Sequence, residues 1–321
     1  MKIVIPGGTG QLGRVLASAF HDCGHDLIVL SRTPRKMTPW RTVYWNGETL
    51  GSWAEEFEGA DAIINLAGQS VNCRYTQHNR RLITDSRVKS TKIVGEAILQ
   101  AWNPPRVWLQ ASTATIYAHR YDAPNDEETG VIGGKEPNAP GTWRFSIDVA
   151  TAWENALKES PTPNTRRVAM RTAIVMHSGA GSPFDMLLRL VRFGFGGQAG
   201  DGRQYMSWIH EQDFVRAIEW LIEHEELEGP VNIASPNPLP NARFMEVLRD
   251  AWGIPYGCPA TELMLEVGAC LLGSETELIL KSRRVVPAKL LRSGFEFEFP
   301  NWADAAKELC LRVEKTSRAA A

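Results

Sequence analysis

Four glycines between a predicted strand and a predicted helix constrain this chain more than any other feature of its sequence. Residues 2–5 are typical of a short buried strand, and from Leu12 onward apolar residues recur at helical spacing. The intervening glycines are Gly7, Gly8, Gly10 and Gly13, which fit both G-x-G-x-x-G and G-x-x-G-x-x-G. One glycine allows a tight turn, one lets the backbone approach a pyrophosphate, and the last lets the helix pack closely on the sheet. In this context the pattern predicts a dinucleotide-binding loop.

The phosphates of such a ligand face free N–H groups at the start of the helix, where the helix dipole favours negative charge. The contacts expected here are Gly7, Gly8, Thr9, Gly10, Gln11, Leu12 and Gly13. The alternative is a tight strand–helix turn that binds nothing.

A basic stretch follows the second predicted strand, Asp26 to Leu30. A fold that binds NAD places an acidic residue about 20 residues beyond the glycines, where it holds the ribose 2′-hydroxyl. This chain has Ser31 and Arg32 there, followed by Arg35 and Lys36. Cations in place of an acid suit a 2′-phosphate, so the sequence predicts NADP (NADPH) as cofactor. A solvated basic loop is the alternative.

Strand-like and helix-like segments alternate as far as residue 176. Further strands are predicted at 43–45, 61–66, 106–111 and 167–176, and helices at 53–57, 79–102 and 145–158. Such alternation is typical of a parallel sheet covered on both faces. The predicted fold class is therefore α/β, a Rossmann-type doubly wound parallel sheet with a smaller, mainly helical C-terminal substrate lobe.

The pattern loosens after residue 176, which suggests a division of the chain. The NADP-binding Rossmann domain is predicted at 1–176 and 209–234, the substrate lobe at 177–208 and 235–313, and a frayed tail at 314–321. Within the lobe, helices are predicted at 242–252 and 261–272, and the alternation of Gly294–Phe299 predicts a half-buried strand.

Composition excludes several classes of function. Of 321 residues, 43% are hydrophobic and 22% charged, and the formal net charge is −2. This balance gives no electrostatic reason to expect nucleic acid or an anionic membrane as a partner. No leader or membrane span is expected, and five cysteines without C-x-x-C suit reduced thiols in the cytoplasm. The scattered histidines and cysteines predict no metal site.

Several motifs together resemble the extended short-chain dehydrogenase/reductase family. They are the glycine loop, Asn65–Gly68, Ser112–Tyr117, Arg171–Thr172 and Trp208–Asp213. More narrowly, the chain resembles an NAD-dependent epimerase/dehydratase-like branch with a C-terminal domain of unassigned function, the cell-division-inhibitor-like nucleoside-diphosphate-sugar epimerases. Marks of that branch are Asp85–Val88, Gly194–Gly197, Arg284–Pro287, Leu290–Leu291 and Gly294–Phe295. The resemblance implies further cofactor contacts at Leu66, Ala67, Gly68, Arg87, Ala111 and Ser112.

The family's chemistry uses a Tyr and a Lys four residues later on one helix, with a Ser or Thr after the preceding strand. Here the Tyr position falls on Ser146 and the Lys position on Ala150, and neither side chain can serve. Thr113 matches the Ser/Thr position and could polarise a carbonyl. Tyr117 is the candidate proton donor, with Asp148 and His210 as weaker ones; a packed aromatic is the alternative for Tyr117, and a hydrogen-bonded structural histidine for His210.

Three functions remain open on these grounds. The first is an NADP(H)-dependent oxidoreductase that acts on a small carbonyl or hydroxyl substrate with an atypical proton donor. The second is a non-catalytic NADP(H)-binding sensor or interaction module, and the third a nucleoside-diphosphate-sugar epimerase. The carboxyl ends of the strands predict an apolar substrate pocket made by Trp143, Phe145, Met206 and Trp208. The long helices 79–102 and 145–158 are candidates for the interface of a homodimer.

Overall fold

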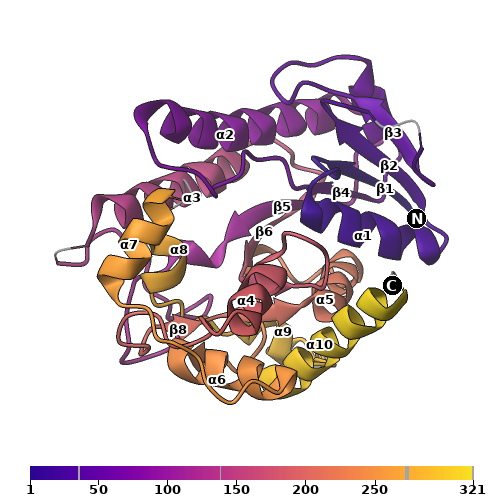
Figure 1. The fold of residues 1–321 in the computed structure, drawn as a ribbon. Helices are drawn as coiled ribbons and strands as arrows, with labels where there is room; N and C mark the ends of the chain where they lie inside the picture. Colours follow the sequence, from indigo (N-terminus) through magenta and orange to yellow (C-terminus); the bar gives the residue numbers. More distant parts are fainter. Residues whose placement is uncertain (35–36, 138, 272–274, 320–321) are drawn as a thin grey trace.

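The computed structural model of the chain describes residues 1–34, 37–137, 139–271 and 275–319. Seven strands form one parallel sheet in the order β10-β6-β5-β4-β1-β2-β3 (Figure 1). They are β1 (Lys2–Pro6), β2 (Asp26–Ser31), β3 (Arg41–Tyr44), β4 (Ala62–Asn65), β5 (Val107–Thr113), β6 (Arg166–Thr172) and β10 (Gly229–Ile233). The chain fills the sheet outward from β1 in both directions, so a switch point lies between β1 and β4. This confirms the predicted doubly wound fold.

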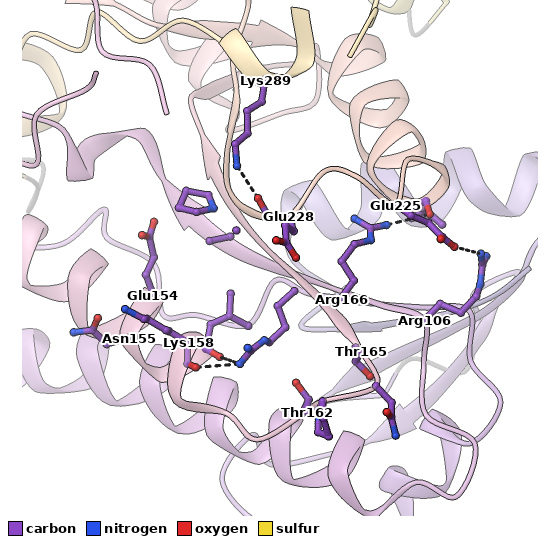
Figure 2. Close-up of a pocket in the computed structure, with 18 residues that line it drawn as sticks. Arg106, Glu154, Asn155, Lys158, Thr162, Thr165, Arg166, Glu225, Glu228 and Lys289 are labelled. Atoms are coloured by element: carbon purple, nitrogen blue, oxygen red, sulfur yellow. Dashed lines mark hydrogen bonds and ion pairs between the residues drawn. The ribbon is translucent and has the colours of Figure 1, made fainter. Parts of the chain in front are cut away.

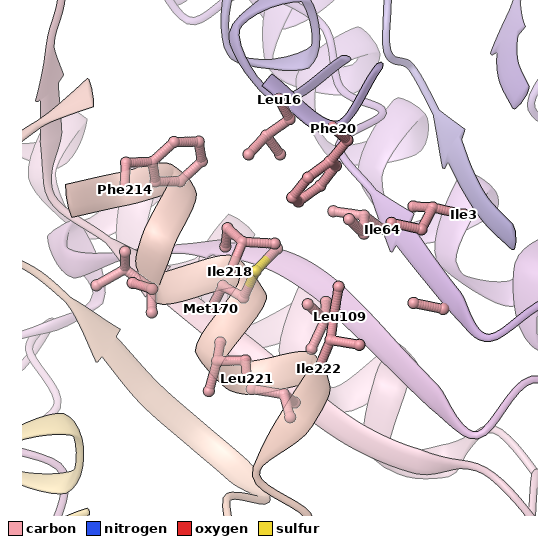
Figure 3. Close-up of a cluster of buried hydrophobic side chains, with 14 of the residues drawn as sticks. Ile3, Leu16, Phe20, Ile64, Leu109, Met170, Phe214, Ile218, Leu221 and Ile222 are labelled. Atoms are coloured by element: carbon pink, nitrogen blue, oxygen red, sulfur yellow. The ribbon is translucent and has the colours of Figure 1, made fainter. Parts of the chain in front are cut away.

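Helices cover both faces of the sheet. They are α1 (Gln11–Asp22), α2 (Gln77–Gln100), α3 (Gly141–Glu159) and α5 (Glu211–Glu223), with the 3-10 turns η1 (Ser52–Phe57) and η2 (Ala114–Ile116). Alternate residues of each strand face opposite layers. Ile3 and Ile5 pack with α1 and α5 (Figure 3), whereas Val4 packs with side chains of α2. Burial on both faces explains the continuous apolar runs in the sequence.

Two consecutive arginines at the start of β6 hold helices on opposite faces. Arg166 donates to the carbonyl oxygens of Leu221 and Leu227, both at 2.6 Å, and so closes the end of α5. Arg167 donates to carbonyls at the end of α3, including that of Ser160 at 2.7 Å. Both line a cavity of about 1080 Å³ at the amino ends of β5, β6 and β10 (Figure 2). Because ligands of such sheets bind at the carboxyl ends, this cavity lies at the opposite edge.

A second core belongs to the C-terminal half of the chain. Its helices are α4 (Pro183–Arg192), α6 (Asn241–Trp252), α7 (Glu262–Leu271), α8 (Glu277–Leu280), α9 (Ala288–Arg292) and α10 (Trp302–Ala319). Short sheets pair β7 (Ile174–Met176) with β9 (Trp208–His210), and β8 (Tyr205–Met206) with β11 (Leu239–Pro240). Phe184, Trp208, Phe244 and Trp302 are buried together there.

Three local predictions differ from the structure. The expected strand 167–176 breaks at Ala173, whose N–H donates to the Ile233 carbonyl, and the chain then leaves the main sheet as β7. The predicted strand Gly294–Phe299 is wrong, because the N–H groups of Glu298 and Phe299 donate to the Asp213 carboxylate, each at 2.8 Å. Its alternation reflects burial of Phe295 in the main core instead. The third concerns the tail predicted to be frayed at 314–321, where α10 continues to residue 319.

Candidate functional site

The glycine loop packs too tightly for side chains at two of its positions. Gly7 has φ +77°, and a Cβ there would lie 2.7 Å from the backbone of Ala67. A Cβ on Gly13 would lie 2.4 Å from the Cα of Gly8, so α1 could not approach the loop. These contacts give two of the glycines the turn and packing roles that the pattern predicts.

Gly10 differs because the space beside it is open. It is exposed, and, apart from its two chain neighbours, the nearest described atom to an added Cβ is the Gly7 carbonyl oxygen, at 3.5 Å. It precedes the first turn of α1 and provides no side-chain cap. The first N–H groups of an α-helix have no intrahelical partner. Gly10 therefore leaves room for phosphate oxygens, and the N–H groups of Gln11 and Leu12 can donate to them, whereas the Gly10 N–H donates to the Gly7 carbonyl at 3.2 Å.

Ser31 ends β2 beside the glycine loop. It is buried, its hydroxyl lies 3.2 Å from that of Thr9, and it accepts a hydrogen bond from the Thr33 N–H at 3.1 Å. The next side chain, Arg32, is exposed and makes no hydrogen bond or ion pair within the described ranges. A free guanidinium thus follows the strand end where a ribose 2′-substituent is expected. Arg35 and Lys36 lie outside the described residues.

Leu66, Ala67 and Gly68 follow β4 and border the loop at the switch point. The Ala67 N–H donates to Asn65 at 3.1 Å, and the Asn65 amide donates to Gln110 on β5 at 2.9 Å. Gly68 is exposed, and an added Cβ would lie 3.3 Å from the Arg87 guanidinium. Arg87 itself donates to the Gln69 carbonyl at 3.0 Å and stacks 4.9 Å from the Trp153 ring centroid. Its charge is thereby fixed beside this floor.

A buried polar network lies behind the end of β5. Ser112 donates to Glu154 at 2.6 Å, and Arg171 donates to both carboxylate oxygens of Glu154, at 2.9 and 2.8 Å. Burial alone would lower the pKa of Arg171, but the Glu154 carboxylate raises it above its ordinary value. The network joins Ser112, beside the half-buried Ala111, to the helix α3.

The Tyr117 hydroxyl is part of this buried network and does not border a cavity. It is 2% exposed, accepts from Arg171 at 3.0 Å and donates to Asn232 at 3.0 Å. Burial raises its pKa, and the Arg171 charge acts against that rise. A hydroxyl enclosed by protein partners has no site for a substrate oxygen, so the structure argues against Tyr117 as proton donor. Thr113, by contrast, is half-buried and accepts only from the Thr115 N–H, at 3.1 Å.

The four predicted substrate residues separate into two groups. Trp143 stacks 4.7 Å from His119 and lines a cavity of about 620 Å³, and Phe145 packs 5.0 Å from Tyr75. Trp208 is fully buried against Trp302, so its prediction as a substrate contact is wrong. Met206 is half-buried, and its sulfur accepts from the Asn241 amide at 3.2 Å. Of the four, Trp143 alone is among the described residues that line this cavity.

The two weaker donor candidates are also placed apart from one another. Asp148 is exposed on α3. His210 is fully buried, lies 3.1 Å from Glu308 and accepts from the Gln212 N–H at 3.2 Å. It caps α5 as a satisfied histidine, and burial lowers its pKa.

Residues 277–283, called the C-terminal segment below, reach the region of Ser146 and Ala150, the two positions of the family's Tyr-Lys pair. Ala150 is buried, and Ser146 donates its hydroxyl to Glu277 of α8 at 2.5 Å. From the same segment, Lys281 donates to the Thr115 carbonyl at 2.7 Å and Arg283 to the Thr115 hydroxyl at 3.0 Å. Figure 1 shows α8 beside α3. No pattern used above predicts these residues as part of the site. The one feature of the sequence that could have indicated them is the grouping of Glu277, Lys281 and Arg283 within seven positions.

Lys281 is 1% exposed, and burial together with the Arg283 charge lowers its pKa from 10.5 to about 8. The unfolded chain therefore binds one more proton between these values, so the free energy of unfolding rises with pH there. We expect the rise to reach about 3 kcal/mol relative to Lys281→Met, which has no such group. Denaturant titrations of both proteins from pH 7 to 10.5 measure it. Parallel curves would contradict the prediction.

In the part of the chain that the structure describes, no three His, Cys, Asp or Glu side chains gather as a metal site would need. Across the same residues, no helix has the length and apolar character to cross a membrane.

Comparison with known proteins yields two family matches to separate parts of the chain. The NAD dependent epimerase/dehydratase family matches residues 3–140, and a domain of unknown function, DUF1731, matches residues 261–309. An epimerase family protein of Mycobacterium leprae is 30% identical over 300 residues, which cover 92% of this chain and 91% of that protein. Epimerase family protein YfhF of Bacillus subtilis is 29% identical over 310 residues, which cover 96% and 98%.

Among solved structures, human epimerase family protein SDR39U1 with NADPH superposes with a TM-score of 0.83 at 26% identity. The match covers 97% of this chain and 99% of that one. Glu277, Lys281 and Arg283 all fall within the segment matched by the domain of unknown function.

Proposed function

The chain belongs to the epimerase family, with a nicotinamide-dinucleotide fold, and from this premise we propose that it is an NADP(H)-dependent oxidoreductase. Its substrate is a small carbonyl or hydroxyl compound, and its proton donor is not the family's tyrosine. When bound, the nicotinamide group supplies or accepts a hydride. The observation that carries the proposal is the open space beside Gly10 at the start of α1, near the end of β2.

The chain's own residues divide the work of binding. Amides at the start of α1 would hold the pyrophosphate, and the exposed Arg32, next to the buried Ser31, would hold the 2′-phosphate. The NADPH held by the human relative supports this choice of cofactor. Thr113 would orient a carbonyl oxygen, and Trp143 and Phe145 favour a small apolar body over a highly charged one.

Arg32→Ala is expected to weaken NADPH binding by about 10- to 30-fold and to leave NADH binding within about twofold. The reason is that a charge-assisted hydrogen bond to phosphate contributes about 1.5–2 kcal/mol, and NADH lacks that phosphate. Fluorescence titration of both nucleotides measures the effect. Arg243→Ala, which removes an exposed arginine paired with Glu246 on α6, is the matched control. Tighter binding of NADH than NADPH by the unchanged protein would refute the cofactor assignment.

A panel of aldehydes, ketones and quinones tests turnover. We expect NADPH oxidation that falls by at least about tenfold in Thr113→Val, because a carbonyl oxygen loses its hydrogen-bond donor. Absence of oxidation across the panel, with NADPH still bound, would favour a sensor or interaction module, a role consistent with Ser146 and Ala150 in place of the Tyr-Lys pair.

A further inference from the structure

We propose that the Glu277 carboxyl, positioned by Ser146, gives and takes the proton of the substrate oxygen. The inference rests on the proposed oxidoreductase function and names the acid that this function requires. It assigns a chemical role to the C-terminal segment, which lies within the match to a domain of unknown function.

The first step is the place that Glu277 occupies. Ser146 stands where the family carries its tyrosine, one turn before the buried Ala150. A serine hydroxyl is too weak an acid for proton transfer near neutral pH. Its hydrogen bond of 2.5 Å to Glu277 Oε2 brings a carboxyl group to the same location. An acid from another part of the chain thus stands where the tyrosine is absent.

The second step is an oxygen without a partner. Glu277 is 1% exposed, yet its Oε1 has no hydrogen-bond partner among the residues that the structure describes. An unpaired buried carboxyl oxygen is unfavourable, because it has lost its hydrogen bonds to water, and such oxygens are therefore uncommon in native proteins. Ser146 occupies one carboxyl oxygen and leaves the other for a substrate hydroxyl or carbonyl.

The third step concerns the charges around the carboxyl. Burial raises the pKa of Glu277 above its ordinary value. The Arg283 charge, the hydrogen bond from Ser146 and the Lys281 charge act against that rise, and the Glu275 charge adds to it. Tyr75 faces the same group, and its own pKa is raised by burial and by the Glu277 charge. The net direction favours the protonated acid. The two cations, 8% and 1% exposed, stay close enough to stabilise the carboxylate after the proton leaves.

The proton balance is simple in both directions. In reduction, the carbonyl carbon gains a hydride from the reduced nicotinamide, the C=O π pair moves to oxygen, and oxygen takes the proton from Glu277 Oε1. The carboxylate is reprotonated by water after the alcohol leaves. In oxidation the carboxylate takes the hydroxyl proton as the hydride departs. A group that serves in both directions works best when its pKa lies near the working pH, and burial raises the pKa of Glu277 in that direction.

Infrared spectroscopy of the full-length protein with NADPH gives a readout that does not depend on turnover. We expect a protonated carboxyl band that persists at a pH above the ordinary titration of glutamate, and that Glu277→Gln removes. Glu275→Gln is the matched control, because Glu275 is buried two positions away and accepts from the Tyr75 N–H at 2.7 Å. A band that survives Glu277→Gln, or no such band in the unchanged protein, overturns the proposal.

Kinetics on the carbonyl panel separates this proposal from the oxidoreductase function. Glu277→Gln is expected to lower kcat by about 100- to 10,000-fold, with NADPH affinity unchanged within about twofold. Ser146→Ala should shift the pH midpoint of the band and of kcat, and Ser146→Thr should restore both. If the unchanged protein turns over and Glu277→Gln retains its kcat, or if Tyr75→Phe alone abolishes turnover, Glu277 is not the acid. If nothing turns over, the oxidoreductase function fails instead.

Discussion

Arg171→Met is expected to lower the free energy of unfolding by about 3–5 kcal/mol, the range measured when one partner of a buried ion pair is removed. Arg171 is 7% exposed and donates to both carboxylate oxygens of Glu154 and to the Tyr117 hydroxyl. Without it, Glu154 stays buried with the Ser112 hydroxyl as its one remaining side-chain donor among the described residues. Urea denaturation followed by circular dichroism measures the change.

The control for this prediction is an exposed ion pair. Arg243→Met breaks the contact between Arg243 and Glu246 on α6, where both side chains are exposed to solvent, and is expected to leave the stability close to that of the unchanged protein. The double variant Arg171→Met, Glu154→Gln should recover part of the loss, because it leaves no buried unpaired charge. Equal stability of Arg171→Met and the unchanged protein would contradict the prediction.

Gly10→Ala is expected to weaken NADPH binding by on the order of 100-fold or more, about 3 kcal/mol, while the protein stays folded. Its backbone, at φ −67°, suits any residue, and the added Cβ meets only the Gly7 carbonyl oxygen at 3.5 Å. The same methyl group occupies the space through which a pyrophosphate must approach. Calorimetric titration with NADPH measures the loss.

Gly13→Ala, three residues away, is expected to lower the stability of the protein, which Gly10→Ala leaves unchanged. Its Cβ would lie 2.4 Å from Gly8, so we expect a loss of about 1–3 kcal/mol in stability as α1 moves off the loop. Within one motif, Gly10 thus serves ligand binding and Gly13 serves packing of α1 on the loop. If Gly10→Ala unfolded the protein, or bound NADPH normally, the assignment of its open side to the phosphates would be wrong.

The N-terminal half of the fold was predictable because its signals are local. A strand, the glycines and a helix follow one another within 22 residues, and β1, β2, β4, β5 and β6 are buried on both faces, whereas the edge strand β3 is partly exposed. The helix starts were less accurate: α3 begins at Gly141 rather than at the predicted residue 145. The glycines that lack room for a Cβ, Gly7 and Gly13, can be inferred from the motif alone.

The C-terminal half depends on contacts that no local pattern encodes. Trp208 follows a strand, which suggests a pocket, but Trp302 reaches it from 94 positions later in the numbering and buries it. Phe295 alternates like a strand residue, yet it packs beside Trp220, with ring centroids 5.7 Å apart, and no strand forms there. Glu277 lies in a helix of four residues, too short for periodicity to detect.

The arrangement of the site also sets the order in which it can be made. Gly7 meets Ala67, 60 positions along the numbering, whereas Glu277 is separated from Ser146 by 131 residues and Arg283 from Thr115 by 168. Contacts across long stretches of chain form late, and synthesis begins at the N-terminus. A growing chain can therefore fold the glycine loop against Ala67 before Glu277, the proposed acid, is translated, so the proposed reaction would require the last fifth of the protein.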